Sequence, residues 1–310
     1  EMSLPQVTVT SDEIDEMLAP ARKRLRLPKG VLQRVAGVYE RKWWRDRENG
    51  WKQGVVLAAE RAMAKAGIMR DQVGLLINAS VSRRHLEPAV STGIHHSLGL
   101  PAACMNFDIT NACLGFVNGI TVASSMIDAG AIDYALIVCG EDPSPWHETA
   151  LRMLNREGST RDEVLAQFAT LTLGSGAAAA VIGRTDRHPE GHRILGSVSR
   201  AGTEHKDLCI GGDAGQGMAT DATGLLTHGL KLVTDAWEEA HREGWDGTDM
   251  DAYVTHQIST SHTNAIVDAV GIGLGAFLLH VPLALPIGVH FGGVAILSVH
   301  QQPVSTDPEL

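Results

Sequence analysis

Four short apolar runs are the feature of this sequence that most constrains its fold. Each has the length of a strand, and helical patterns such as residues 114–129 separate them; the runs are residues 73–78, 105–109, 134–139 and 177–182. Continuous apolar composition is typical of strands that are buried on both faces, and strands that alternate with helices favour parallel pairing. The sequence therefore predicts an α/β fold with a largely parallel sheet.

Helix signals precede and separate these runs. Thr10 and Glu13 have the spacing of a capping box, so a helix is expected to begin between them. Residues 53–67 predict a second helix, with apolar side chains on one face and Gly67 as its stop. Both signals agree with an α/β architecture.

A second series of elements begins after the polar, turn-rich segment 186–191. It comprises a predicted strand, an amphipathic helix and another strand, at residues 193–199, 229–242 and 252–255. We therefore divide the chain into an N-terminal half, residues 1–190, and a C-terminal half, residues 191–310. We expect the two halves to form one layered α/β body.

The segment 271–299 differs from the rest of the chain because it is almost wholly apolar or glycine. A run of about 20 apolar residues can span a membrane as a helix. Pro282, Pro286, His280 and His290 interrupt this run and oppose that interpretation. We therefore expect no stable membrane insertion.

Composition narrows the class of protein. The 310 residues are 44% hydrophobic and 20% charged, which is typical of a soluble globular protein, and the net charge of −10 argues against nucleic acid as a partner. The four cysteines show no CxxC spacing, so we expect neither a metal site nor a disulfide framework. The acidic start, EMSLPQVTVTSDEID, lacks the apolar core of a signal peptide, and the expected compartment is a reducing cytoplasm.

Cys113 is the first candidate for chemistry. It follows the apolar run 105–109 and precedes the helical pattern 114–129, so we expect it at a strand–turn–helix junction. Helix N-termini stabilise a thiolate, which is the nucleophilic form of cysteine. Free cysteine is also among the most buried residue types and is usually inert. The local pattern leaves the nucleophile and the packing interpretation equally open.

His256 and Glu87 are the other candidates. His256 follows a predicted strand, where open α/β sheets gather functional groups, and an imidazole there can activate a thiol or bind a substrate carbonyl. With 14 histidines in the chain, a single one is more often structural. Glu87 precedes a proline in a polar loop, where a solvated turn residue is the ordinary interpretation and a base strengthened by burial is the functional one.

Two further motifs have residue types that occur in binding sites. Gly174, Ser175 and Gly176 precede a small-residue strand and indicate close backbone packing, without the spacing or the following helix of a nucleotide site. The basic and aromatic run 39–47 has side chains that can grip an anionic cofactor, but we expect a solvated helix face there. We therefore assign no cofactor-binding residues.

Taken together, three motifs resemble the thiolase superfamily, in particular its ketoacyl-synthase-III-like condensing enzymes. DITNACLGFVNG around Cys113 is similar to the family's nucleophile motif, TLGSGAAAAVIG to its glycine-hinged central strand, and THQIS around His256 to its histidine motif. Order and spacing fit over residues 8–270. The resemblance implies a layered α-β-α-β-α fold of two pseudo-repeated halves, the second of them incomplete in this chain.

Within the family, TNACLGF and HLEPA are most similar to the members that join two fatty acyl-CoA thioesters in bacterial olefin biosynthesis. The resemblance therefore implies an acyltransferase that performs a non-decarboxylative Claisen condensation. It implies that Cys113 takes the first acyl group, that His256 orients or polarises its carbonyl, and that Glu87 is the base that reaches the partner's Cys113 in a homodimer. Fatty acyl-CoA, or acyl-ACP, is the implied substrate, with no cofactor and no metal.

Two alternatives stay open within this resemblance. One is a decarboxylating 3-oxoacyl-ACP synthase III of fatty acid or polyketide synthesis, for which Glu87 would be dispensable. The other is a catalytically impaired homologue that acts as a structural partner. The C-terminal sequence gives weight to the second alternative.

That C-terminal sequence departs from the family. The resemblance implies a catalytic asparagine after the histidine and then a glycine-rich oxyanion loop, but no asparagine follows Asn264 in this chain. The departure is abrupt near Val270, so we expect the second half to be aberrant from there, through a frameshift or an equivalent rearrangement of the coding sequence. Each missing oxyanion donor costs about 10²–10³ in rate.

Overall fold

The computed structural model describes residues 1–212, 217–245, 253–256, 259–271 and 294–301. Its strands are β1 (Met2–Ser3), β2 (Val7–Thr10), β3 (Glu40–Trp43), β4 (Leu75–Asn78), β5 (Met105–Asp108), β6 (Tyr134–Glu141), β7 (Gly176–Gly183), β8 (His192–Arg200), β9 (Cys209–Gly211), β10 (Met218–Thr220) and β11 (Val294–Gln301). Its α-helices are α1 (Ser11–Met17), α2 (Ala19–Leu25), α3 (Gly50–Ala66), α4 (Val90–Leu98), α5 (Gly115–Asp128), α6 (Ser144–Asn155), α7 (Arg161–Thr172), α8 (Ala222–Arg242) and α9 (Thr260–Val270). Short helical turns are η1 (Leu32–Ala36), η2 (Arg70–Gln72), η3 (Ala112–Leu114) and η4 (Thr203–Leu208).

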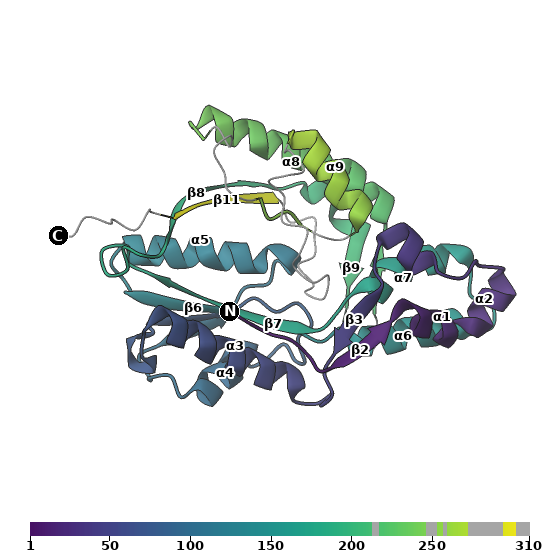
Figure 1. Cartoon of the computed structure of the whole chain (residues 1–310), viewed down its shortest axis with the longest axis horizontal. Helices are drawn as coiled ribbons and strands as arrows, with labels where there is room; N and C mark the ends of the chain where they lie inside the picture. Colours follow the sequence, from purple (N-terminus) through teal and green to yellow (C-terminus); the bar gives the residue numbers. More distant parts are fainter. Residues whose placement is uncertain (213–216, 246–252, 257–258, 272–293, 302–310) are drawn as a thin grey trace.

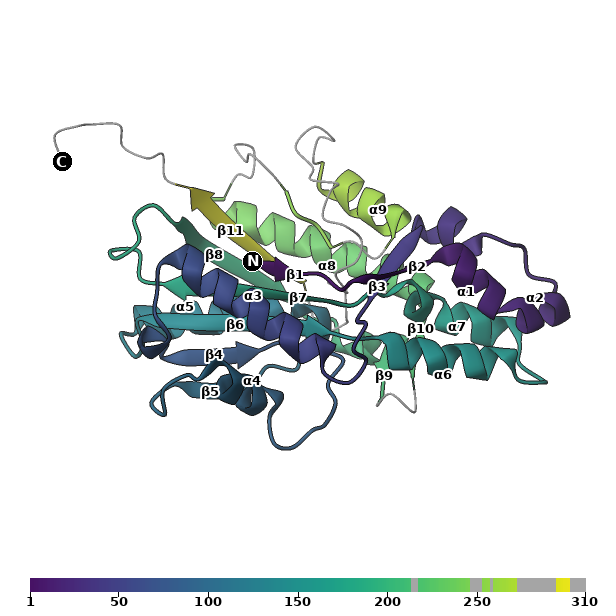
Figure 2. The same cartoon turned by 60° about the horizontal axis from the view of Figure 1, so that its bottom comes forward.

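The main sheet has the strand order β1-β7-β6-β4-β5. β4 pairs in parallel with both β5 and β6, as expected, whereas β7 pairs antiparallel with β6 and with β1. The prediction of parallel pairing was therefore wrong for β7. The reason is the connection from β6 to β7, because α6 and α7 pack with α1 and α2 beyond one end of the sheet instead of crossing its face (Figures 1 and 2).

The expected five-layer order is confirmed (Figure 1). α3 and α4 cover one face of the main sheet, and α5 covers the other. The antiparallel ribbon of β8 and β11 lies over α5, and α8 and α9 form the outer layer. The sequence order of helices and strands thus builds a layered α-β-α-β-α body with α5 at its centre.

The apolar runs are continuous because both faces of their strands are buried. Leu76 and Leu136 are part of the core on the side of α3 and α4, whereas Leu75, Ile77 and Ile137 are part of the core on the side of α5. Successive side chains of a strand point to opposite faces, so a strand between two helical layers needs apolar residues at every position. All five side chains are fully buried.

Helix signals in the sequence located the helices well but not all of their starts. Thr10 and Glu13 form the predicted capping box of α1, and Gly67 ends α3 with φ 67°. α3 begins three residues before its predicted start, and α8 begins seven residues before, at Ala222. The N-cap of α8 is Asp221, whose side chain accepts from the N–H of Gly224. Helical boundaries therefore depend on capping contacts beyond the apolar pattern.

The basic and aromatic run 39–47 does not form the solvated helix that we expected. Residues 40–43 of this run form β3, which pairs with β2, and the side chain of Arg41 is fully buried. The Arg41 guanidinium donates to the backbone oxygen of Val9 at 3.3 Å and to Oγ of Ser11 at 3.0 Å. Burial lowers the pKa of Arg41 to about 10. The Arg41 side chain therefore makes hydrogen bonds inside the fold, and an anionic cofactor in solution cannot reach it.

Part of the divergent C-terminal sequence has a place in this fold. Residues 294–301 form β11, which pairs with β8 along its whole length. The segment 272–293, on which the membrane, asparagine and frameshift predictions depend, lies outside the described residues. Within the part of the chain that the structure describes, no helix combines the length and the apolar character needed to cross a membrane.

Candidate active site

Cys113 lies in the turn that links the main sheet to the central helix. β5 ends at Asp108, η3 spans Ala112–Leu114, and α5 begins at Gly115. Cys113 is half-buried in η3, two residues before α5 begins. The predicted strand–turn–helix junction is confirmed.

The backbone of this turn is held in a fixed conformation. Ala112 has a φ of 43°, in the left-handed region that costs a residue with a side chain about 1–2 kcal/mol. A Cβ at Gly115 would lie 3.3 Å from carbonyl oxygens just past the ends of β4 and β5, so glycine lets α5 approach the sheet closely. Nδ2 of Asn111 donates to Oδ1 of Asn118 at 2.7 Å and ties the turn to α5. These contacts fix the position of Cys113.

Burial raises the pKa of three cysteines of this chain, Cys104, Cys139 and Cys209. It raises the pKa of Cys104 to about 11 and also raises the pKa of Cys209. It raises the pKa of Cys139 well above its usual value, with the charges of Glu141 and Cys113 as further causes. A thiol with a raised pKa is a poor nucleophile because little of it is thiolate. Cys104, Cys139 and Cys209 are therefore poor candidates for the nucleophile.

A buried carboxylate, Glu141, ends β6 two residues after Cys139. It accepts hydrogen bonds from the backbone N–H groups of Val81 at 2.6 Å and Ser82 at 2.8 Å, from Oγ of Ser82, and from Sγ of Cys139 at 3.4 Å. Burial raises the pKa of Glu141, and the hydrogen bonds from Ser82 and Val81 oppose this rise. Because Val81 and Ser82 begin the loop that follows β4, Glu141 fastens the base of that loop.

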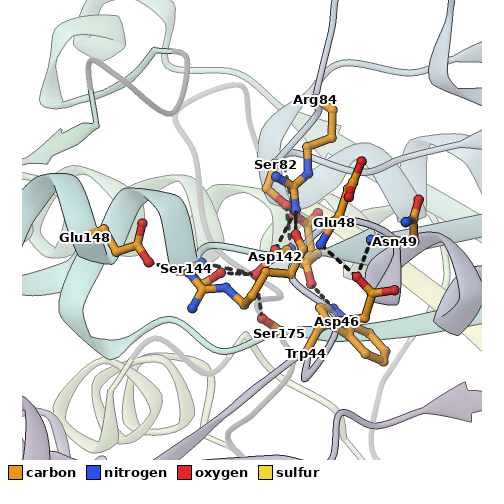
Figure 3. Close-up of polar contacts among 12 residues, drawn as sticks. Trp44, Asp46, Glu48, Asn49, Ser82, Arg84, Asp142, Ser144, Glu148 and Ser175 are labelled. Carbon is orange, nitrogen blue, oxygen red and sulfur yellow. Dashed lines mark hydrogen bonds and ion pairs between the residues drawn. The ribbon is translucent and has the colours of Figure 1, made fainter.

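Asp142, the next residue, is the centre of a polar network (Figure 3). Its Oδ2 accepts from Nη2 of Arg84 at 2.8 Å, and its Oδ1 accepts from the hydroxyls of Ser144 and, at 3.2 Å, Ser175. The same Nη2 of Arg84 donates to the backbone oxygen of Arg47 at 2.6 Å. Only 2% of the Asp142 side chain is exposed. Asp142 thereby joins the loop after β4 to the segment before β7.

Glu87 lies in the loop 79–89, which connects β4 to α4. Because β4 and β5 are parallel neighbours, this loop and the Cys113 turn leave the same edge of the sheet. Residues 84–88 are exposed, and the peptide bond between Glu87 and Pro88 is cis. The predicted polar loop is confirmed, and within one chain the Glu87 side chain faces solvent.

His256 lies in the segment 253–256, between α8 and α9. Tyr253 makes a single β-bridge and the next three residues are irregular, so the described part of this segment is not the predicted strand; Ala252 lies outside the described residues. His256 is half-buried. Its grouping with Cys113 and Glu87 in one site therefore stays a prediction.

Glu141, Asp142 and Arg84 were not among the residues predicted for the site. The two acids directly follow the apolar run 134–139, and charged residues at the carboxyl end of a buried strand were the available signal. Arg84 gave no comparable signal, because its partner lies 58 positions away in the sequence. Only the folded chain brings the three residues together.

In the residues that the structure describes, no group of three or more histidine, cysteine, aspartate or glutamate side chains is placed to hold a metal ion. A hollow of about 540 Å³ lies beside Trp44 and Gln53, and another of about 360 Å³ lies beside Ser124 and Arg184. Cys113 lines neither hollow, so we assign them no part in its chemistry.

Known proteins match this chain over most of its length. The family model for 3-oxoacyl-[acyl-carrier-protein] synthase III matches residues 107–202, which include Cys113. An acyl-CoA:acyl-CoA alkyltransferase of Xanthomonas campestris is 40% identical over 266 residues, which are 86% of this chain and 78% of the relative. An enzyme of the same name from Shewanella oneidensis is 30% identical over 282 residues, which are 87% of this chain and 80% of the relative.

Solved structures agree with these relatives. A cysteine-to-alanine variant of Xanthomonas campestris OleA has a TM-score of 0.86 at 36% identity, and the match covers 94% of this chain and 83% of that one. The synthase III named FabH from Xanthomonas oryzae has the same TM-score and identity and is covered to 84%. Layered fold and cysteine turn together define an acyl-transferring condensing enzyme. The chain belongs to the ketoacyl-synthase-III-like condensing enzymes of the thiolase superfamily, and the resemblance found in its motifs is confirmed.

Proposed function

We propose that this chain is an acyltransferase that joins two fatty acyl-CoA thioesters head to head by a non-decarboxylative Claisen condensation. The observation that carries the proposal is the Cys113 turn, a strained strand-to-helix junction inside the segment that matches the synthase III family. The relatives at 40% and 30% identity are named acyl-CoA:acyl-CoA alkyltransferase, and OleA has been solved with bound lauric acid and lauroyl-CoA.

Sequence spacing supports the choice of site residues. OleA has been solved as variants of one cysteine, one glutamate and one histidine. That glutamate precedes the cysteine by 26 positions, and Glu87 also precedes Cys113 by 26 positions. The OleA histidine follows the cysteine by 142 positions, and His256 follows Cys113 by 143. We therefore assign Cys113, Glu87 and His256 as the corresponding residues.

In the first step, the Cys113 thiolate attacks the thioester carbonyl of one acyl-CoA. A bond forms between Sγ and the carbonyl carbon, the bond from that carbon to the CoA sulfur breaks, and CoA leaves as the thiol after it takes up a proton. His256 orients or polarises the carbonyl. The place of Cys113 before α5 favours the thiolate, because N–H groups at a helix start stabilise an anion.

In the second step, a base removes a proton from the α-carbon of one acyl group. The resulting carbanion attacks the thioester carbonyl of the other acyl group, so that a carbon–carbon bond forms and the thiol leaves with its electron pair and a proton. Decarboxylation does not supply the carbanion, so the reaction needs a base, and we assign that role to Glu87. Its exposure within one chain fits a side chain that reaches the partner's Cys113.

The edge of the main sheet supports a homodimer. β5 is the last strand of that sheet in the described residues (Figure 2). The N–H groups of Met105 and Ile109 donate toward β4, so the alternate N–H groups of Asn106 and Asp108 face the open edge. An open edge of this kind pairs readily with a strand of another chain. We propose that two copies of β5 pair across a two-fold axis.

Carrier and compartment belong to the same proposal. We propose CoA as the carrier of both acyl groups, because two relatives that match 86% and 87% of this chain bear CoA in their names. Acyl-ACP is the alternative carrier. Cys104, Cys139 and Cys209 form no disulfide, which supports a reducing cytoplasm as the compartment.

Acylation of Cys113 is the direct test of the first step. The wild-type chain and Cys113→Ala are incubated with lauroyl-CoA and analysed by intact-mass and peptide mass spectrometry. We expect a lauroyl adduct on the peptide that contains Cys113, with release of CoA, and no adduct in the variant. A wild-type chain that carries no adduct, or an adduct on another residue, would contradict the proposal.

A decarboxylating 3-oxoacyl-ACP synthase III is the second candidate. A β-ketoacyl-[acyl-carrier-protein] synthase III of Sodalis glossinidius is 30% identical over 258 residues, which are 76% of this chain and 74% of the relative. Such an enzyme obtains its carbanion by loss of CO₂ from a malonyl donor and needs no base. Full activity of Glu87→Ala with malonyl-ACP would favour this candidate, and a chain that dimerises without any turnover would favour an impaired homologue.

A further inference from the structure

We propose that Arg84 and Asp142 position the loop that carries Glu87, and so control the condensation step without affecting acylation of Cys113. This inference rests on the proposed function, since it assigns the base of that reaction to the loop. Neither Arg84 nor Asp142 is assigned contact with the substrate, so both are positioning residues.

The two ends of the loop 79–89 are each fastened by a buried carboxylate. Glu141 holds the start through the two N–H groups described above. Asp108, at the end of β5, holds the far end, because its two oxygens accept from the N–H groups of Val90 and Ser91 at 2.9 Å each. The side chain of Asp108 is only 8% exposed. Both anchors are therefore parts of the rigid sheet.

Arg84 attaches the middle of the loop to the body of the fold, beside a longer ion pair of 3.9 Å between Arg83 and Asp108. Residues 84–88 are exposed, and Nη2 of Arg84 reaches back both to Oδ2 of Asp142 and to the backbone oxygen of Arg47, at 2.8 Å and 2.6 Å (Figure 3). One nitrogen thus joins the loop to the end of β6 and to the segment before α3. Glu87 lies three positions after this attachment.

Asp142 is a fixed point for that attachment. Its backbone N–H donates to Oγ of Ser82 at 2.8 Å, and its second carboxylate oxygen accepts from Ser144 and Ser175. Because several hydrogen bonds hold the Asp142 carboxylate in place, it cannot move together with Arg84. The ion pair therefore restricts the motion of the Arg84 side chain. A displacement of about 1 Å at a reacting group can cost 10²-fold in rate. Loss of the Arg84 contact is therefore expected to act on the carbanion-forming step.

The decisive variant is Arg84→Met, with Arg47→Met as its matched control. The two arginine side chains are 35% and 40% exposed, but the Nη2 of Arg47 pairs with exposed Glu148 on α6 and its guanidinium does not hold the loop. We expect Arg84→Met to lower the condensation rate about tenfold or more while Cys113 acylation stays within about twofold. Arg47→Met should leave both rates unchanged. Arg84→Lys should retain most of the condensation rate, because a single nitrogen of Arg84 makes both contacts.

Two comparisons separate positioning from general damage. In a Glu87→Ala background, Arg84→Met should cause no further loss of condensation, because both changes act through the same base. Amide hydrogen exchange in residues 83–88 should become faster in Arg84→Met and in Asp142→Asn, and not in Arg47→Met. Equal losses of acylation and condensation in Arg84→Met, or an additional loss in the double variant, would overturn the inference, as would unchanged condensation.

The proposed function fails by a different observation. A wild-type chain that forms no acyl-Cys113 rejects the function itself, and hydrogen exchange then decides whether Arg84 orders the loop. Unchanged exchange in Arg84→Met rejects the positioning role in either case.

Discussion

His147 is fully buried in α6, where the indole N–H of Trp43 donates to its Nδ1 at 3.1 Å. Burial is the main cause that lowers the pKa of His147 to about 3, and the positive charges of Arg41 and Arg47 contribute to this shift. The imidazole is therefore neutral in the folded chain, whereas it takes up a proton at its ordinary pKa of 6.5 when the chain unfolds. The unfolded state binds more protons in this interval, so stability that is complete above pH 6.5 is lost as the pH falls towards 3.

This residue should give the chain a measurable pH dependence. We expect the free energy of unfolding to fall by up to about 1.4 kcal/mol per pH unit below pH 6.5 through His147 alone. His147→Asn retains an acceptor for Trp43 but does not titrate there, so its urea unfolding curves should depend less on pH. His96→Asn, at an exposed position of α4, is the control. Equal pH dependence of wild type and His147→Asn would contradict the assignment.

Local sequence predicted the Cys113 turn, and it did not predict the network around Asp142. A strand run, a turn and a helical pattern adjoin within residues 105–129, so their junction can be placed without tertiary information. Arg84 and Asp142 meet only because β4 and β6 are neighbours in the sheet. The burial of Arg41 and His147 also escaped prediction, since charged and polar residue types favour the surface unless a partner compensates them.

At the scale of elements, α3 packs on β6 through a glycine. A Cβ at Gly140 would lie 2.1 Å from Cγ2 of Val55, closer than carbon atoms approach in proteins. The helix can approach the sheet at this point only because no side chain intervenes. The Trp44 indole packs against Gly54 of the same helix, where a Cβ would lie 2.2 Å from the ring.

Replacement of Gly140 by alanine tests this packing. We expect Gly140→Ala to lower the free energy of unfolding by about 1–3 kcal/mol, because the extra methyl group must displace Val55 or the helix. Gly196→Ala in β8 is the matched control, since a Cβ there would meet no atom within 4 Å. Urea unfolding of both variants measures the difference. Equal stabilities of the two variants would show that α3 does not pack as closely on β6 as the structure indicates.

Strands could be predicted from the sequence where both faces of the strand are buried, but the direction in which each strand runs in the sheet could not. The runs that became β4, β6 and β7 are apolar at nearly every position, so their burial on both faces was readable from composition. The reversed direction of β7 depends on where α6 and α7 pack, which no local pattern encodes. In the run 39–47, where we expected a solvated helix face, β3 has only four residues, which are too few for a strand alternation to show.

At the scale of the whole molecule, the open edge of β5 should set the oligomeric state. Asn106→Pro removes an N–H that faces this edge and leaves the ladder to β4 intact. Asn106→Ala is the control, because both replacements lose the hydrogen bonds that Oδ1 of Asn106 accepts from the hydroxyls of Ser91 and Thr92. We expect sedimentation at twice 33.1 kDa for the wild type and for Asn106→Ala, and a monomer for Asn106→Pro. A dimeric proline variant or a monomeric wild type would refute pairing through β5.

The exposed loop that carries Glu87 leads to an expectation about complementation between two inactive variants of this chain. If Glu87 of one subunit serves Cys113 of the other, as we propose, a mixed dimer of Glu87→Ala and Cys113→Ala chains holds one site with both groups and one site with neither. Random pairing of equal amounts makes about half of the dimers mixed, so co-expression of two inactive chains should recover about a quarter of the wild-type sites. Two recessive alleles of one gene would thus complement each other, which a base acting within its own chain does not permit.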